Sequence, residues 1–295
     1  MSILVVAILS IVQGATELLP VSSSAHVILL EKLFGLDPTS PEMTFLLVML
    51  HTGTTVAVLI YFWNRWKSLL SRQDHERGTF VLMLVIGTAI TAVVGLVLQA
   101  LLVRAFLPGQ KGAVVENLFG NVWIIATALA SVGVLTTIAG FLGRRDTGSK
   151  ADHPATGRTG KMLWTGLLAG TAQGLALPFR GFSRSGGTIS TGLLGGLERR
   201  FAEELSFALG LILTIPVVAR EALRLRATVH AAGQHLSALP WLWGLAGAVL
   251  SFGAGLAAIR WLSSWLERGR WGFFGLYCLA LSAVIFVLAS TRVLG

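Results

Sequence analysis

The stretch QGATELLPVSSSAH, residues 13–26, decides how the rest of the chain is arranged. It sets a glutamine, a carboxylate, three serines and a histidine between segments that are otherwise apolar. A carboxylate at membrane depth costs about 2.5 to 3.5 kcal/mol even on lenient insertion scales, so an acidic residue there marks a functional site by default. The stretch therefore predicts a polar site inside a membrane protein.

A second stretch, AQGLALPFRGFSRSGGT at residues 172–188, repeats the same order of residues. Both stretches contain a Gln-Gly pair, a short apolar step, a Leu-Pro pair and a serine-rich turn that opens a new apolar run. The matching pairs are Gln13-Gly14 with Gln173-Gly174, and Leu19-Pro20 with Leu177-Pro178. We therefore expect two related halves, each carrying one polar hairpin.

The composition is that of a membrane protein. Of the 295 residues, 54% are hydrophobic and only 13% are charged, with a mean hydropathy of +0.75, whereas about a quarter of the residues in a soluble domain are charged. Long unbroken apolar runs favour helices over a barrel of alternating strands. We predict an all-α polytopic membrane protein. Six runs approach or exceed the roughly 20 residues that a spanning helix needs, namely 42–63, 79–103, 117–142, 202–219, 239–262 and 271–291.

The positive charge is explained by topology in a lipid bilayer and indicates no nucleic-acid partner. The net charge is +9, but no basic run is interleaved with aromatic residues, and Lys and Arg lie mainly between the apolar runs. Fourteen of them lie on the side that holds the loops near 64–78, 143–161, 199–200 and 260–270, and seven lie on the other side. We expect the first side to be cytoplasmic, which leaves both termini outside.

The first polar stretch predicts a re-entrant helical hairpin over residues 1–34. Its apolar parts, 1–12 and 25–34, are each too short to span a bilayer. Pro20 disfavours the helical conformation at Leu19, and a serine can cap the second half-helix. The same device is expected over 161–198. The residues that break this second hairpin are expected to be Pro178, Gly181 and Gly186-Gly187.

Each half then consists of one hairpin followed by three full spans. A hairpin returns the chain to the side of the membrane where it began, and three spans then carry it to the other side. The second half is therefore inserted with the opposite orientation, as in transporter folds whose binding site lies where the two repeats meet. We predict a first repeat over 1–142, a polar cytoplasmic linker over 143–160 and a second, inverted repeat over 161–295.

The first hairpin gathers groups that can act on a phosphate. Gln13 and Glu17 are four residues apart and share one helix face. Three consecutive serines open the next half-helix and a histidine follows one turn later, so a hydroxyl, an imidazole and a carboxylate can converge. Of these serines, Ser22 and Ser24 are interpreted as helix caps rather than nucleophiles. The candidate residues are Gln13, Glu17, Ser22, Ser23, Ser24 and His26.

The second hairpin adds arginine to a helix start. A half-helix N-terminus binds anions because its free N–H groups and the positive end of its dipole face the ligand. Guanidinium groups bind phosphate oxygens in pairs, so two opposed helix starts with arginine predict a phosphate or diphosphate ligand. The residues are Arg180, Ser183, Arg184, Ser185, Gly186, Gly187 and Thr188.

Three other polar residues receive structural interpretations. His51, in the LHTGTT segment of the first full span, is interpreted as a satisfied interior histidine. Glu203 and Glu204 are interpreted as helix-start carboxylates, one of which can brace the arginines.

Four segments together resemble the bacterial undecaprenyl-diphosphatase family, the bacitracin-resistance phosphatases: QGATELLPVSSSAH, LHTGTTVAVLIYFW, FSRSGGTIS and EELSFALGLILTIP. The resemblance covers nearly the whole chain. It implies a phosphatase of the bacterial plasma (inner) membrane that removes the terminal phosphate of undecaprenyl diphosphate and recycles the lipid carrier for peptidoglycan synthesis. It also implies that bacitracin competes for this substrate and that the site is reached from the outer face.

The resemblance implies roles for individual residues. Glu17 and position 13 belong to the family's acidic motif, which is expected to hold a divalent cation, Mg²⁺ or Ca²⁺. Ser23 and His26 belong to its serine-histidine element, and Arg184 is its diphosphate-binding arginine. Many members carry glutamate where Gln13 stands. The PFRGF step here replaces the commoner PGF and adds an arginine without an assigned role.

We expect Ser23, His26 and Glu17 to be catalytic, with Ser23 as nucleophile and His26 or Glu17 as its base, although His26 can itself be the nucleophile. The residues expected to bind substrate are Arg184, Ser22, Ser24, Ser183, Ser185, Gly186 and Thr188.

Two rival functions use similar features. A phosphatidic-acid-phosphatase enzyme needs a second histidine shortly after its Ser-Arg pair, but the next histidine after Arg184 is His230. A transporter or flippase for a polyprenyl phosphate would suit the inverted repeat equally well. The oligomeric state is open, a homo-oligomer included.

Overall fold

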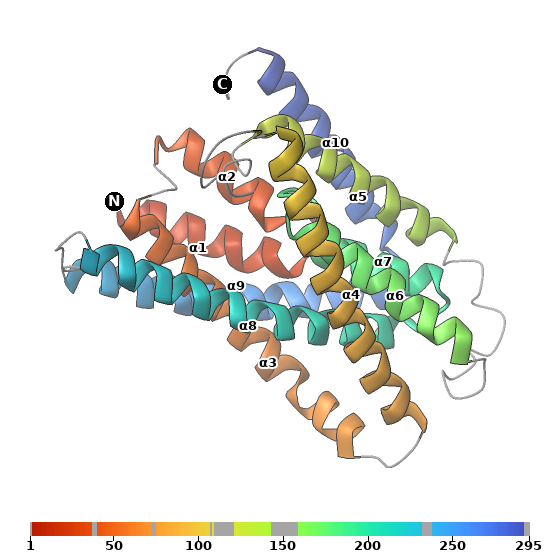
Figure 1. The fold of residues 1–295 in the computed structure, drawn as a ribbon. Helices are drawn as coiled ribbons and strands as arrows, with labels where there is room; N and C mark the ends of the chain where they lie inside the picture. Colours follow the sequence, from red (N-terminus) through yellow and green to blue (C-terminus); the bar gives the residue numbers. More distant parts are fainter. Residues whose placement is uncertain are drawn as a thin grey trace.

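Ten α-helices make up the described part of the chain in a computed structural model (Figure 1). The structure describes residues 2–36, 40–71, 75–106, 108, 121–142, 159–231 and 238–291. No strand occurs within those ranges, which confirms the all-helical prediction. The helices are α1 (Ile3–Leu18), α2 (Ser23–Leu33), α3 (Pro41–Ser71), α4 (His75–Phe106), α5 (Val122–Leu142), α6 (Thr159–Ala176), α7 (Arg184–Leu194), α8 (Arg199–Ala231), α9 (Ala238–Glu267) and α10 (Gly272–Ser290).

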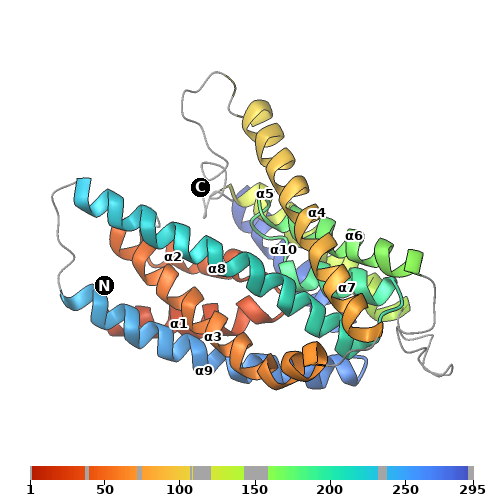
Figure 2. The ribbon, with the colours of Figure 1, turned by 60° about the horizontal axis from the view of Figure 1, so that its bottom comes forward.

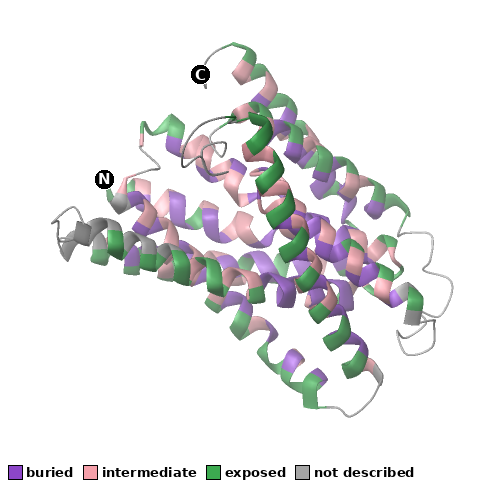
Figure 3. Ribbon diagram, in the orientation of Figure 1, coloured by how far each residue is buried: buried purple, intermediate pink, exposed green. Residues whose placement is uncertain are grey.

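Six of these helices, α3, α4, α5, α8, α9 and α10, are long and apolar enough to cross a membrane. They correspond to the six apolar runs of the sequence, so the chain is a multi-pass membrane protein. Figure 3 shows α4 exposed along much of its length, and large apolar side chains such as Leu96 and Leu101 lie on its exposed surface. Lipid tails are as apolar as leucine and accept such a surface. The other four helices are short and form two consecutive pairs, α1 with α2 and α6 with α7.

The first short pair is broken at residues 19–22. Leu19 is extended, with φ −75° and ψ 150°, as expected before a proline. Ser22 has φ 65°, a left-handed conformation that is uncommon outside glycine. Its hydroxyl accepts the backbone N–H of Ala25 and so caps α2. The predictions that Pro20 ends the first helix and that a serine caps the second are confirmed.

The second short pair is broken at residues 177–183. Gly181 has φ 113° and lies so close to α5 that a Cβ would overlap the backbone carbonyl of Ile125. Ser183 caps α7 by accepting the N–H of Gly186. The prediction that Gly186-Gly187 contributes to the break is wrong, because both residues lie inside α7, where their missing side chains make room for neighbouring atoms.

Close helix contacts surround the two broken pairs. Helix α9 packs along both α1 and α3, while α5 packs along α10 and α4 along α6. Helix α3 packs against both α8 and α9 and lies between them in Figure 2. A Cβ at Gly14 or Gly53 would overlap a backbone oxygen of Ser251 or Ala248 in α9. These glycines therefore let the helices approach closely, as small residues do at membrane helix interfaces.

The two breaks touch each other. The hydroxyl of Ser185 donates to the carbonyl oxygen of Leu19 over 3.3 Å, which ties the start of α7 to the end of α1. Polar residues that are far apart in the sequence thereby meet. The predicted linker, 143–160, lies outside the described residues except for its last two positions.

Candidate active site

Glu17 lies at the centre of a hydrogen-bonded cluster built from both polar stretches. It is in the last turn of α1, and its side chain is 15% exposed. Its Oε2 accepts from Oγ of Ser23 at 2.6 Å and from Nε2 of Gln13 at 3.1 Å. Its Oε1 accepts from the guanidinium group of Arg184 at 3.2 Å. Four residues predicted for the site are thus brought together.

The position of Ser23 follows from the turn before α2. Ser23 is the first residue of α2, directly after the left-handed Ser22, so the chain reversal brings its hydroxyl back to α1. The 2.6 Å distance to the Glu17 carboxylate is typical of a charge-assisted hydrogen bond. A carboxylate placed here can accept the hydroxyl proton, which is what a serine nucleophile requires.

Arg184 opens α7 and reaches both α1 and α8. Its Nη2 donates to Glu17, and its Nη1 donates to Oγ1 of Thr214 at 2.9 Å. Gly210 leaves room for the guanidinium group, since a Cβ there would overlap it. Glu17 and Arg184 are 167 residues apart in the sequence. The contact therefore joins the two halves of the chain. Thr214 and Gly210 lie in the segment EELSFALGLILTIP, but nothing in that segment alone indicated that they surround Arg184.

His51, interpreted from its sequence context as a satisfied interior histidine, also contacts the cluster. Its Nε2 lies 3.2 Å from Nε2 of Gln13 and 3.8 Å from Oε2 of Glu17. Its Nδ1 donates to the carbonyl oxygen of Leu47 at 2.8 Å. His51 and Gln13 are 38 residues apart, so local spacing gave no signal that they meet.

His26 points away from the cluster. Its Nδ1 donates to the carbonyl oxygen of Ser22 at 2.8 Å, and its Nε2 accepts from the hydroxyl of Tyr277 at 2.7 Å. The two rings stack with centroids 5.8 Å apart. The structure therefore does not bring His26 together with Ser23 and Glu17 as the sequence suggested, because the imidazole turns back to its own helix and reaches α10. In this position His26 supports the Ser22 turn.

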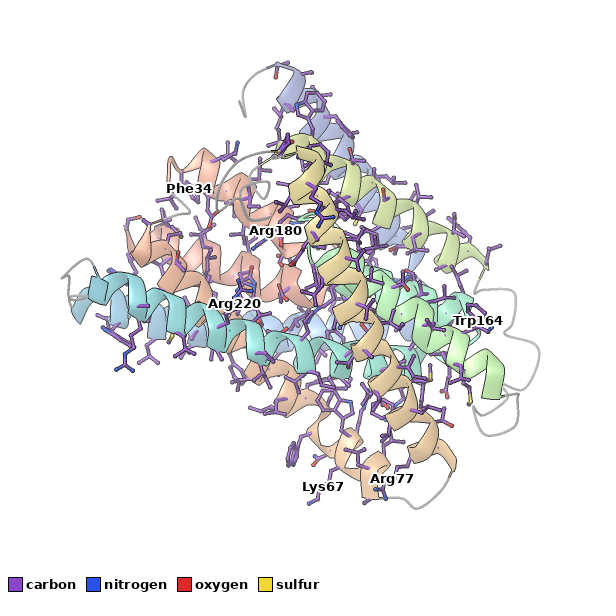
Figure 4. The ribbon with its side chains drawn as sticks, viewed as in Figure 1. Phe34, Lys67, Arg77, Trp164, Arg180 and Arg220 are labelled. Carbon is purple, nitrogen blue, oxygen red and sulfur yellow. The ribbon has the colours of Figure 1, made fainter. Side chains whose placement is uncertain are left out.

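A cavity of about 420 Å³ borders the cluster. Three arginines and one glutamate line it, which leaves an excess of positive charge suited to a phosphate-bearing ligand. Two of the arginines, Arg180 and Arg220, lie in the region framed by α2, α4 and α8 (Figure 4). Apolar side chains form part of the wall and suit a prenyl chain, among them Leu47, Val48, Leu177, Leu213 and Val217.

The residues expected to bind substrate divide into two groups. Those that line the cavity are Ser22, Ser24, Ser183 and Arg184. Those buried inside α7 are Ser185, Gly186 and Thr188. Each of the buried three uses a polar group in a hydrogen bond within the protein. The buried group therefore holds the break and α7 in place.

Two side chains near the cavity, Glu17 and Gln13, have the chemistry to hold the divalent cation that the resemblance implies. The described residues contain no group of three or more His, Cys, Asp and Glu side chains that could hold a metal ion. The carboxylate of Glu17 and the amide oxygen of Gln13 are, however, the kind of ligand that Mg²⁺ and Ca²⁺ prefer. Oε1 of Glu17 accepts from Arg184, and Oε2 accepts from Ser23 and Gln13, so a cation would share this carboxylate with those donors. These two side chains fit the group when diphosphate oxygens complete the coordination.

The whole chain is similar to one group of known proteins. The sequence profile of the family described as Bacitracin resistance protein BacA matches residues 6–284. Undecaprenyl-diphosphatase 2 of Acinetobacter baylyi is 48% identical over 98% of this chain and 99% of its own length. Undecaprenyl-diphosphatase 1 of Burkholderia pseudomallei is 36% identical over 94% of each chain. Undecaprenyl-diphosphatase 2 of Burkholderia ambifaria is 36% identical over 97% of this chain and 96% of its own length. With a match of this extent, the chain belongs to the bacitracin resistance protein BacA family.

Proposed function

We propose that this chain hydrolyses undecaprenyl diphosphate to undecaprenyl phosphate and inorganic phosphate, which recycles the lipid carrier for peptidoglycan synthesis. The observation that carries the proposal is the 2.6 Å contact between Ser23 and Glu17, beside Arg184, in a cavity lined by three arginines. The names of the relatives, undecaprenyl-diphosphatases, support the same substrate. Neither these names nor the described residues favour the transporter alternative.

In the proposed reaction, Oγ of Ser23 attacks the terminal phosphorus while Oε2 of Glu17 accepts the hydroxyl proton. The bond between that phosphorus and the bridging oxygen breaks, and undecaprenyl phosphate leaves with the bridging oxygen. Arg184 binds oxygens of the transferring phosphoryl group, where negative charge accumulates. Water then hydrolyses the phosphoserine and releases inorganic phosphate. His26 acts through the Ser22 turn that positions the nucleophile.

Substrate binding divides along the cavity wall. The polar end holds the diphosphate through Arg184 and the helix-start serines Ser22, Ser24 and Ser183, all of which line the cavity. The apolar wall accommodates the first prenyl units. Because bacitracin competes for the same lipid diphosphate, we expect it to inhibit the reaction by withdrawing substrate.

The proposed reaction uses a divalent cation, Mg²⁺ or Ca²⁺, for which Glu17 and Gln13 supply oxygen ligands. When bound, the cation neutralises charge on the transferring phosphoryl group. A chelator in excess is expected to abolish phosphate release, and full activity in chelator would remove the cation from the proposal.

The proposed setting is the bacterial plasma membrane, with the cavity reached from the outer face. Each broken pair of short helices is followed by three long apolar helices, which supports two inverted repeats. The repeats are 1–142 and 161–295, each starting with a re-entrant hairpin. The linker 143–160 is cytoplasmic, and both termini are outside.

Phosphate release from undecaprenyl diphosphate by the purified chain tests the proposed function. The parent is expected to release phosphate, and Ser23→Ala to lose at least about a thousandfold in turnover, as other nucleophile variants do. Ser131→Ala, at an exposed position on α5, is the control and should match the parent. Parental turnover in Ser23→Ala would remove the serine from the mechanism. Movement of the lipid across a vesicle without phosphate release would favour the transporter alternative instead.

A further inference from the structure

Gln13, Glu17 and His51 place three polar atoms at one point beside the cavity. Nε2 of His51 lies 3.2 Å from the Gln13 amide and 3.8 Å from Oε2 of Glu17, and the Gln13 amide lies 3.1 Å from the same Oε2. Gln13 is only 1% exposed, whereas Glu17 and His51 line the cavity. The point where the three meet therefore borders the space that a substrate would enter.

The hydrogen bond at Nδ1 determines what His51 offers to this point. A carbonyl oxygen can only accept, so Nδ1 carries the proton that it donates to Leu47. With Nδ1 protonated in this way, the neutral form of the ring has its lone pair on Nε2, the nitrogen that faces Gln13 and Glu17. Histidines that bind metal ions have the same arrangement, in which the second ring nitrogen donates to a carbonyl or carboxylate and fixes the ring.

Gln13 can offer either end of its amide. As placed, Nε2 faces Glu17 and His51. A half-turn of the amide exchanges the nitrogen with Oε1. Three atoms with lone pairs, two oxygens and one nitrogen, are then separated by 3.1 to 3.8 Å. Neighbouring ligands of a cation bound at roughly 2.1 Å are about 3 Å apart, so the spacing suits a shared cation.

We infer that Gln13, Glu17 and His51 form a three-ligand site for a divalent cation, and that the imidazole makes this site bind Mn²⁺ or Zn²⁺ more tightly than Mg²⁺ or Ca²⁺. The inference rests on the proposed function, in which a cation assists diphosphate hydrolysis. Glu17 and Gln13 alone offer only oxygen, which suits Mg²⁺ and Ca²⁺. A nitrogen ligand from His51 shifts the preference toward first-row cations. Water or diphosphate oxygens complete the coordination from the cavity.

Arg184 limits how tightly the cation binds before an anion arrives. Its guanidinium group lies 3.2 Å from Oε1 of Glu17, so the arginine and the cation share one carboxylate. A diphosphate group brings negative charge that both can bind. Inorganic pyrophosphate is therefore expected to tighten the binding of Mn²⁺.

Binding of Mn²⁺ to the purified full-length chain tests the site without turnover. Free Mn²⁺ is followed by electron paramagnetic resonance during titration, with and without pyrophosphate, and Mg²⁺ is added as competitor. The parent should bind Mn²⁺ at least about tenfold more tightly than Mg²⁺. His51→Gln, which keeps a polar side chain of similar size, should weaken Mn²⁺ binding about tenfold or more and reduce the preference for Mn²⁺. Thr52→Val is the matched control, because its hydroxyl donates to the carbonyl oxygen of Val48 in the same helix.

A second variant keeps the test decisive if His51→Gln folds poorly. Gln13→Glu adds a carboxylate to the same point and should raise Mg²⁺ affinity, so that the preference for Mn²⁺ falls. Parental Mn²⁺ affinity in a folded His51→Gln, unchanged selectivity in Gln13→Glu, or equal Mn²⁺ and Mg²⁺ affinities in the parent would each overturn the inference. Gln13 would then be a hydrogen-bond bridge between Glu17 and His51.

Phosphate release from undecaprenyl diphosphate, measured on the same samples, separates this inference from the proposed function. A chain that hydrolyses the lipid but shows no Mn²⁺ binding that depends on His51 refutes the metal site alone. A chain that binds Mn²⁺ through His51 but releases no phosphate refutes the proposed function alone.

Discussion

The guanidinium group of Arg184 holds two partners in different directions, Glu17 in α1 and Thr214 in α8. Lysine keeps the charge, but its compact ammonium cannot reproduce the planar arrangement of donors. We expect Arg184→Lys to lower kcat about a hundredfold or more, the loss typical of one missing oxyanion donor. Steady-state phosphate release measures the effect. Thr214→Val removes one of the two hydrogen-bond partners of Arg184 and should lower kcat about tenfold. Parental turnover in Arg184→Lys would contradict the role assigned to the arginine.

Gly210 matters because of the space that it leaves. A Cβ at this position would overlap Nη1 and Cζ of Arg184. The arginine side chain moves more readily than the α8 backbone, so Gly210→Ala should displace the guanidinium and reduce turnover about tenfold or more. The Tm of the purified protein should change by only a few degrees. Gly253→Ala in α9, where a Cβ meets nothing within 4 Å, is the control. A large fall in Tm with normal turnover in Gly210→Ala would assign the glycine to packing alone.

Local spacing predicts a contact within this site only where both partners are close in the sequence. Gln13 and Glu17, four residues apart, share a helix face and do contact each other. The contact between His51 and Gln13 spans 38 residues, and no local spacing indicated it. The sequence placed His26 beside Ser23 and Glu17, but Nε2 of His26 instead forms a hydrogen bond with the hydroxyl of Tyr277, 251 residues later.

At the scale of the elements, the break before α7 depends on one glycine. Gly181 combines φ 113° with close contact to the Ile125 carbonyl. We expect Gly181→Ala to destabilise the protein by more than the roughly 1 to 2 kcal/mol that positive φ alone costs, because the turn must also move away from α5. Gly35→Ala provides the comparison, since Gly35 has φ 63° but a Cβ there meets nothing within 4 Å. Thermal unfolding of both variants measures the difference, and equal Tm values would exclude the contact with Ile125 as a cause.

Element boundaries followed from the sequence where backbone chemistry is strict. Proline restricts the residue before it, and Leu19 is indeed extended ahead of Pro20. Glycine predicts the end of a helix less reliably, because it also occurs inside helices where neighbouring atoms occupy the space of a side chain. This is why Gly186 and Gly187 lie within α7 and not in the break.

At the scale of the whole molecule, the split of Lys and Arg predicts orientation. Cysteines introduced near Asp74 and Asp152, which lie outside the described residues, should react with an impermeant reagent only from the cytoplasm. A cysteine near Gly112, also outside the described residues, should react only from the exterior. Intact cells and inside-out vesicles provide the two sides of the measurement. Labelling of positions 74 and 152 from opposite sides would rule out the inverted repeat.

The contact between Glu17 and Arg184 can form only late in the synthesis of the chain. The two residues are 167 positions apart, and a ribosome adds about 5 to 20 residues per second, so the arginine is made roughly 10 to 30 s after the glutamate. During that interval the carboxylate has emerged without its guanidinium partner. Gln13 and Ser23 are made much earlier than Arg184, and both donate hydrogen bonds to the Glu17 carboxylate. The nascent first half therefore contains hydrogen-bond donors for its own buried carboxylate before Arg184 is made. Ribosome-bound chains that end before α7 would show whether these donors suffice to stabilise α1 and α2.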